Sequence, residues 1–278
     1  MLCPKCHQPI DPTAFICSNQ HQFHSENGVL NLLDEGLRQQ IDLIYQHRAQ
    51  VARKLPEIAD DDYNHLPYAL AAQHFEWQMR AYDADVVLKL LKSRPRQTVL
   101  EIGAWNGWLT HLIAEQGNTV TAVDYFAHPT DGLGAKQHYR VQWSAVKMDI
   151  TDLSLFEQQF DVIVINHGLH FFPDPVGYVE QVRRLVAPGG LLILIGLTFF
   201  RDPTNRRAQV KNLVEQSEKD FGHSLFIKPT RGYMDFADKA KLQAMGIRLY
   251  QHRQLWKANL KGRLITGAPA YFYGVEQV

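Results

Sequence analysis

The stretch TVLEIGAWNGWLT, residues 98–110, decides the fold of this chain. Its first five residues are apolar or β-branched apart from Glu101, as in a β-strand that is buried on both faces. A turn containing Gly103 and Gly107 follows, and the overlapping segment GWLTHLIAEQG has the spacing of an amphipathic helix that ends at Gly117. This order of strand, glycine-rich turn and helix indicates the ligand-binding edge of an open α/β sheet.

The same alternation of short apolar runs and helical stretches continues along the chain and predicts a mostly parallel sheet with helices on both faces. We expect seven strands and, besides the first helix, helices over DPVGYVEQVRRLVAPGG and near Asn205–Phe221. After TVLEI, the predicted strands are TVTAVD ending in Asp124, a strand near RVQWSAVKMD ending in Asp149, DVIVINH, LLILIGL, IRLYQH and AYFYGVE.

The turn after the first strand lacks the dinucleotide-binding pattern. That pattern needs glycines at 103, 105 and 108, but Trp105 and Trp108 occupy two of these positions. Two indoles would obstruct close contact between backbone amides and a pyrophosphate, so a nicotinamide-dependent oxidoreductase is disfavoured. Asp124 lies 23 residues beyond Glu101, a spacing that brings an acid to a ribose bound at the turn.

The pattern acid-x-Gly-x-Gly-x-Gly fits better, with Glu101, Gly103 and Gly107 present and Trp105 in place of the middle glycine. Here the chain resembles the class I S-adenosylmethionine-dependent methyltransferases, and INHGLHFFPDP and VRRLVAPGGLLILIG extend the resemblance. The resemblance implies a Rossmann-like sheet, an enzyme that transfers a methyl group, and S-adenosyl-L-methionine as cofactor. This ligand carries no phosphate, so it can lie over a turn whose middle side chain turns aside.

The resemblance also implies a set of cofactor-binding residues. Asp124 matches the acid that binds both ribose hydroxyls, and Asp149 with Ile150 matches the position beside the adenine. A carboxylate at a strand end also commonly caps the next helix, so the role of Asp149 stays open. Arg80, in the segment before the first strand, can reach the methionine carboxylate or form an exposed salt bridge. The full predicted set is Glu101, Gly103, Ala104, Trp105, Gly107, Asp124, Tyr125, Asp149, Ile150, Asn166 and Arg80, with Glu101 organising the turn more than touching the cofactor.

His167 and His170 in NHGLHFF are the candidate general bases, because imidazole titrates near neutral pH. A base is needed only where the acceptor must lose a proton during attack, and a histidine at a strand exit is also commonly a hydrogen-bonded part of the scaffold. Phe171 and Phe172 can stack on a planar acceptor or pack into the core. The segment lacks the proline pair of adenine- and glutamine-methylating enzymes, which disfavours their stacking arrangement.

The first seventeen residues contain all three cysteines, Cys3, Cys6 and Cys17. CPKC followed by CSNQH is typical of a tetrahedral zinc site, with His21 as the expected fourth ligand and His24 or His7 as alternatives. Four protein ligands leave no position for water or substrate, so we expect structural zinc and no cysteine nucleophile.

The N-terminal stretch CPKCHQPI…ICSNQHQFHSENGVLNLL resembles, over about thirty residues, the zinc module of bacterial 23S rRNA guanine-N1 methyltransferases. Two later segments, FFRDPTNRRAQVKNL and HRQLWKANLKGRLITGAP, are basic. Together these features favour an RNA base as acceptor. The formal net charge of zero argues against RNA, because dedicated RNA-binding proteins are usually basic. The cations that can face phosphates are Arg206, Arg207, Lys211, Lys257, Lys261 and Arg263.

The composition of the 278 residues, 45% hydrophobic and 21% charged, is typical of a soluble globular protein. No apolar run approaches the ~20 residues that span a bilayer, and the N-terminus lacks an apolar signal segment, so we expect a cytoplasmic protein with no membrane partner. Residues 201–278 carry 14 Lys or Arg against 7 Asp or Glu, a net charge of +7. This basic third can guide an anionic substrate or form an ordinary solvated face.

We therefore expect three parts: a zinc knuckle at 1–30, a helical lid or linker at 31–97, and an S-adenosylmethionine-binding domain at 98–278. Substrate-specific insertions are expected at about 198–236 and 252–269. The predicted reaction is methyl transfer to an N or O nucleophile, with an RNA base slightly favoured as acceptor. A small-molecule O- or N-methyltransferase and a non-catalytic binding module remain alternatives, and the oligomeric state is open.

Overall fold

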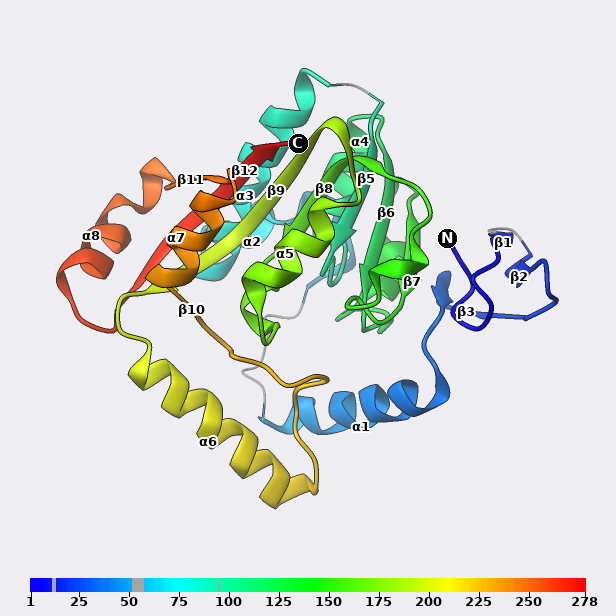
Figure 1. Ribbon diagram of the computed structural model, residues 1–278, viewed down its shortest axis with the longest axis horizontal. Helices are drawn as coiled ribbons and strands as arrows, with labels where there is room; N and C mark the ends of the chain where they lie inside the picture. The colour runs from blue at the N-terminus through cyan, green and yellow to red at the C-terminus, as the bar shows by residue number, and fades with distance from the viewer. Residues whose placement is uncertain (12–13, 52–57, 95) are drawn as a thin grey trace.

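Among the residues that the structure describes, a mixed sheet of ten strands forms the centre of the protein (Figure 1). The structure is a computed structural model, and it describes all residues except 12–13, 52–57 and 95. The first two of these positions belong to the predicted zinc knuckle and the others to the predicted helical segment, so that part of each prediction lies outside the described residues.

The seven predicted strands are all present and lie side by side in the order β11-β12-β9-β8-β5-β6-β7. Neighbours from β9 to β7 run parallel, whereas β12 is antiparallel to both β9 and β11. Their bounds are β5 Thr98–Ile102, β6 Thr119–Asp124, β7 Ser144–Lys147, β8 Phe160–Asn166, β9 Val186–Phe200, β11 Arg248–Tyr250 and β12 Pro269–Gln277.

The expectation of seven strands is wrong, because three more join the same sheet: β3 (His24–Glu26), β4 (Val29–Asn31) and β10 (Met234–Asp235). The end of the predicted knuckle supplies β3 and β4; β4 pairs with β7 in parallel, while β3 pairs with β4. This pairing covers the edge of β7 that would otherwise expose unpaired backbone groups. At the other side, β9 is long enough for its end to pair with β10. The strands β1 (Ile10–Asp11) and β2 (Ile16–Cys17) form a separate small hairpin.

The third predicted strand ends at Lys147 and not at Asp149. The Asp149 carboxylate accepts hydrogen bonds from the backbone N–H and the hydroxyl of Thr151, at 3.0 and 2.6 Å. This local bonding stabilises a turn in place of a continued strand.

Two layers of helices cover the sheet (Figure 1). The strands are apolar on both faces, as along β5, where Val99 and Leu100 belong to different core clusters. One cluster contains residues of α3 (Phe75–Lys92) and α4 (Thr110–Glu115), and the other contains residues of α5 (Pro175–Arg183) and α7 (Phe236–Ala244). This is the arrangement predicted from the continuous apolar runs.

The helix boundaries follow local chemistry. Asp174 caps α5 by accepting the N–H of Gly177 at 3.1 Å, and Pro175 occupies the first helical turn. Within the predicted helical segment 31–97, α2 (Tyr68–Ala71) and α3 are separate helices, because His74 has an extended backbone. None of the helices within the described ranges has the length and apolar character needed to cross a membrane.

Three further helices lie outside these layers. In Figure 1, α1 (Glu35–Val51) and α6 (Thr204–Phe221) lie beneath the sheet, and α8 (Trp256–Leu264) lies beside β12. The segment after α6 contacts α1, since the Gln40 amide donates to the carbonyl of Ile227 at 3.0 Å.

Candidate active site and metal cluster

A cavity of about 710 Å³ lies at the carboxyl ends of the central strands. The turns after β5 and β6 and the segment after β8 contribute to its wall, and α3, α6 and residues 225–230 enclose it. Of the predicted site residues, Arg80, Gly103, Trp105, Asp124, Tyr125, Ile150, Asn166, His167 and His170 line this cavity. Glu101, Ala104, Gly107 and Asp149 do not line it.

Trp105 has a left-handed backbone (φ 51°), so it adopts the conformation for which glycine is normally used at this position of the turn. Its N–H donates to Asp124 Oδ2 at 2.8 Å, and its indole N–H donates to Asp131 Oδ1 at 2.5 Å. These bonds oppose a conformational cost of ~1–2 kcal/mol. The indole is thereby fixed against the wall, beside the ring of Trp77 at 5.6 Å.

Glu101 lies beneath the turn and is fully buried. Its carboxylate accepts hydrogen bonds from the Thr110 hydroxyl and the Asn166 amide, both at 2.6 Å. Burial raises the pKa of Glu101 to about 7, although these hydrogen bonds act in the opposite direction. Gly107 has φ 82°, and a Cβ at this position would lie 2.8 Å from the ring of Trp143. Glu101 and Gly107 therefore support the turn from outside the cavity.

Asp124 ends β6 at the cavity wall. One carboxylate oxygen accepts the N–H of Trp105, and the other accepts the N–H of Tyr125 at 2.6 Å. These backbone donors fix the carboxylate beside the turn after β5, at the position where the sequence predicts a ribose.

The Asp149 side chain does not line the cavity, but it binds residues of the cavity wall. Its carboxylate accepts the Tyr125 hydroxyl at 2.8 Å and forms an ion pair with Lys228 at 2.7 Å. Burial alone would raise the pKa of Asp149, but the hydrogen bonds from Lys228 and Thr151 hold it below its usual value. The cavity wall next to it is formed by Ile150 and Thr151. Contact between the Asp149 side chain and adenine stays a prediction.

Two buried polar atoms of cavity-lining residues have no hydrogen-bond partner within the described chain: Arg80 Nε and Asn166 Oδ1. The Arg80 guanidinium lies 5.0 Å from the ring centre of Trp77 and 5.2 Å from that of Trp105. Burial lowers the pKa of this guanidinium, which nonetheless stays positively charged at neutral pH. A cationic donor and an amide acceptor thus remain for a ligand that carries both a negative and a positive group.

The two predicted bases have different surroundings. His167 Nε2 lies 2.8 Å from Asp83 Oδ2. His170 contacts Phe171, and burial together with the charge of Arg206 lowers its pKa to about 4. His170 is therefore neutral near pH 7.

The part of the cavity away from the turn after β5 is mostly apolar. Phe171 and Phe172 both line it. Phe171 is 48% exposed, whereas Phe172 is largely buried and stacks on Tyr178 at 3.7 Å. Further apolar side chains come from α6, from the segment after it and from β12, among them Leu213, Leu225, Phe226 and Phe272.

Sequence reasoning missed Asp83 and His252, which lie in the cavity wall together with His167. Asp83 is buried on the same side of α3 as Ala84 and Val87, and a charged residue among apolar neighbours at helical spacing is a usable signal. No pattern in the sequence connects it to His252, which lies 169 positions later.

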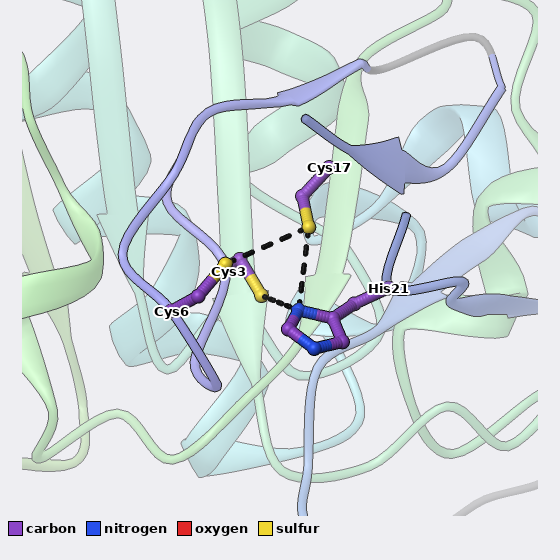
Figure 2. A group of neighbouring side chains, drawn as sticks. All are labelled: Cys3, Cys6, Cys17 and His21. Carbon is purple, nitrogen blue, oxygen red and sulfur yellow. Dashed lines mark hydrogen bonds between the residues drawn. The ribbon is translucent and has the colours of Figure 1, made fainter. Parts of the chain in front are cut away.

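The four predicted zinc ligands lie together beside the N-terminal hairpin (Figure 2). Cys6 Sγ and Cys17 Sγ are 3.7 Å apart, and His21 Nδ1 lies 3.4 Å from the sulfurs of Cys3 and Cys17. Tetrahedral zinc with ordinary bond lengths requires edges of about 3.8 Å between sulfurs and about 3.6 Å between sulfur and nitrogen. Among the described residues, neither His24 nor His7 belongs to this group, so His21 is the histidine that the structure brings to the cysteines.

Comparison with known proteins supports the interpretation of the sheet edge. Residues 100–194 match a family described as "Methyltransferase domain". A ubiquinone biosynthesis O-methyltransferase from Pseudomonas paraeruginosa is 33% identical over 104 residues, which cover 35% of this chain and 43% of that protein. One from Klebsiella pneumoniae (strain 342) is 35% identical over 98 residues, covering 33% and 39%. The chain thus spans less than half the length of these relatives.

Among solved structures, an O-methyltransferase family protein from Burkholderia thailandensis has a TM-score of 0.45 and 16% identity, with 87% of this chain and 71% of that chain covered. The family match begins at residue 100, so it does not bear on the N-terminal cysteines, and their likeness to an rRNA methyltransferase module stays a prediction. Residues 100–194 of this chain are thus similar to a methyltransferase domain.

Proposed function

We propose that the whole chain is an S-adenosylmethionine-dependent methyltransferase that methylates a hydroxyl group of a small molecule. The observation that carries this proposal is one continuous cavity. It extends from the turn after β5 into a part lined by Phe171, Leu213, Leu225, Phe226 and Phe272, the apolar chamber. One ligand can therefore lie at the strand edge with its reactive end directed toward a second ligand in the chamber.

The polar part of the cavity fits S-adenosylmethionine. Asp124 supplies a carboxylate for the ribose hydroxyls, and Ile150 supplies an apolar surface for the adenine. The unpartnered Arg80 Nε and Asn166 Oδ1 match the carboxylate and the ammonium of the methionine end. Trp105 leaves room for this ligand, since its indole is bonded to Asp131 at the wall.

The apolar chamber favours a small acceptor over an RNA base. Leu213, Leu225 and Phe226 are suited to an apolar molecule, whereas phosphate-binding side chains would be needed for RNA. The names of the relatives also favour O-methylation, because both are ubiquinone biosynthesis O-methyltransferases. An N-methylated small molecule and an RNA base, both expected from the sequence alone, have no comparable support.

The bound cofactor supplies an electrophilic methyl group on sulfur. The protein must place the acceptor oxygen in line with that methyl and keep water away, and such positioning can supply ~7–11 kcal/mol of the barrier reduction. The cavity, with the rings of Trp105 and Phe171 in its wall, is suited to these two purposes.

Zinc, in this proposal, is bound by Cys3, Cys6, Cys17 and His21 and has a structural role. The sulfur and nitrogen separations suit a tetrahedral ion with no open position. So small a module lacks a large apolar core, and metal binding would supply its folding free energy. The division into a knuckle (1–30), a helical segment (31–97) and the catalytic domain (98–278) belongs to the same proposal, as does a cytoplasmic location.

The test is incubation of the purified chain with methyl-labelled S-adenosylmethionine and, in separate reactions, a metabolite extract and total RNA. We expect the label in a small molecule, at an oxygen. Label in RNA would show that the acceptor is RNA and not a small molecule. If no methyl group is transferred and calorimetry shows no binding of S-adenosylhomocysteine, the proposal that the chain is an enzyme is contradicted.

A further inference from the structure

Asp83 lies between two histidines that are far from it in the sequence. Its Oδ2 is 2.8 Å from His167 Nε2, and its Oδ1 is 2.8 Å from His252 Nε2. The three residues come from α3, from the segment after β8 and from the segment after β11, and all three line the cavity. Asp83 is only 2% exposed, so this is a buried carboxylate with one imidazole on each oxygen.

The carboxylate determines the tautomer of both rings. Burial alone would raise the pKa of Asp83, but the hydrogen bonds from His167 and His252 keep it below its usual value. An ionised carboxylate can only accept hydrogen bonds, so each ring must donate through Nε2–H, and a neutral ring then has its lone pair on Nδ1. Within the described part of the chain, no hydrogen bond engages Nδ1 of either ring.

The backbone holds His167 at the centre of the site. Its N–H donates to the carbonyl of Ile195 at 3.1 Å, and its φ is 52°. The ring lies against Gly196 on β9, where a Cβ would come within 2.4 Å of Nδ1. Glycine at 196 is therefore required for this ring position. Asn166, the preceding residue, contributes to the proposed cofactor site.

We infer that His167 removes the proton from the acceptor hydroxyl through Nδ1, and that Asp83 and His252 are positioning residues that hold His167 in the required tautomer. This inference rests on the proposed methyltransferase function and defines its acceptor as a group that must lose a proton. The acceptor oxygen forms a bond to the methyl carbon while the carbon–sulfur bond breaks and its electron pair stays on sulfur. The proton moves to His167, and the resulting imidazolium is stabilised by the Asp83 carboxylate. The products are the methyl ether, S-adenosylhomocysteine and one proton released to solvent.

Several charged or titratable groups surround His167. Arg80 and Asp83 belong to α3, His252 precedes α8, and His170 lies in the same segment as His167. Burial, with contributions from Arg80 and His252, lowers the pKa of His167 in spite of its bond to Asp83. His167 is therefore neutral and able to accept a proton at pH 7.

The first test determines tautomers by ¹⁵N spectroscopy of the histidine rings in the full chain with S-adenosylhomocysteine. We expect protonated Nε2 and bare Nδ1 for His167, and protonated Nε2 for His252. In Asp83→Asn, the amide offers one acceptor and one donor, so one ring should change to the Nδ1–H form. Protonated Nδ1 on His167 in the wild type would overturn the inference.

The second test compares catechol with 4-nitrocatechol, whose hydroxyl is already ionised at pH 8, as acceptors. His167→Gln and Asp83→Asn should lower kcat for catechol by ~10²–10⁴-fold, the usual contribution of a general base, with a much smaller loss for 4-nitrocatechol. The exposed His65→Gln is the control for both acceptors. Equal losses with both acceptors would indicate a structural role and overturn the inference.

Calorimetry with S-adenosylhomocysteine separates this inference from the function on which it rests. Binding by the wild type and by both variants, together with a loss restricted to catechol, supports the proton-accepting role. If the wild type binds the ligand but methylates no hydroxyl compound of a metabolite extract, the inference fails and the cofactor site stands. If the wild type does not bind it, the proposed function itself fails.

Discussion

At the scale of single residues, Trp105 explains how this turn departs from a glycine-rich pattern and still leaves a cavity. Its backbone N–H donates a hydrogen bond to Asp124 and its indole N–H donates one to Asp131, so the side chain lies along the cavity wall. The sequence predicts that the side chain turns aside, but it does not identify Asp131 as the partner. That contact depends on the conformation of residues 125–135, which no local pattern determines.

Replacement of Asp124 by alanine should weaken binding of S-adenosylhomocysteine by about 10- to 100-fold, because hydrogen bonds to a charged group contribute ~1.5–3 kcal/mol each. Calorimetry measures the affinity, and zinc content should be unchanged. Asp152→Ala is the matched control, since Asp152 caps a nearby short helix and does not line the cavity. Equal affinity in Asp124→Ala and the wild type would refute the ribose assignment.

Arg80→Met should weaken S-adenosylhomocysteine binding by about tenfold or more while leaving methylthioadenosine almost unaffected. The second ligand lacks the amino-acid end that Arg80 is proposed to bind. Comparison of the two affinities separates loss of that contact from distortion of the whole site. A parallel loss for both ligands would contradict the assignment of Arg80.

Glu101 should make the protein less stable as pH rises. Its pKa is raised from 4.5 to about 7 in the folded state, so between these values the folded chain binds more protons than the unfolded chain. Stability contributed by the protonated form is therefore lost as pH rises toward 7, by roughly 3 kcal/mol in total. Urea unfolding of Glu101→Gln and the wild type should diverge in favour of the variant between pH 5 and pH 8. A constant difference across this range would show that Glu101 does not titrate there.

At the scale of elements, the strands and the main helices were predictable because burial on both faces gives continuous apolar runs. The prediction failed at β3, β4 and β10, which have two or three residues each. Such short strands carry too few side chains for a periodic pattern, and they form because a free edge is available for pairing. The break between α2 and α3 was likewise not apparent from hydrophobic spacing.

The N-terminal hairpin should depend on metal. We expect one zinc ion per chain in the purified protein and its loss in Cys17→Ser, because that change removes one of the four ligands. His24→Ala is the control and should retain the metal, since His24 is exposed and outside the cluster. Elemental analysis with protein quantification measures both. Full zinc in Cys17→Ser, or none in the wild type, would contradict the assignment.

At the scale of the whole molecule, the cavity requires segments that lie far apart in the chain, from α3 to β12. The central strands supply the edge that we propose binds the cofactor, α3 supplies Arg80 and Asp83, and the segment after β11 supplies His252. The sequence could predict the first group because strand, turn and acid follow one another closely. It could not predict the Asp83–His252 pair, because only the folded chain brings together residues 169 positions apart.

The most direct test of this account is a crystal structure of the chain with S-adenosylhomocysteine. We predict the ribose hydroxyls within hydrogen-bond distance of the Asp124 carboxylate and the methionine carboxylate beside Arg80, with the sulfur directed toward the chamber near His167. The ligand bound elsewhere, or the Trp105 indole occupying this space, would contradict the account.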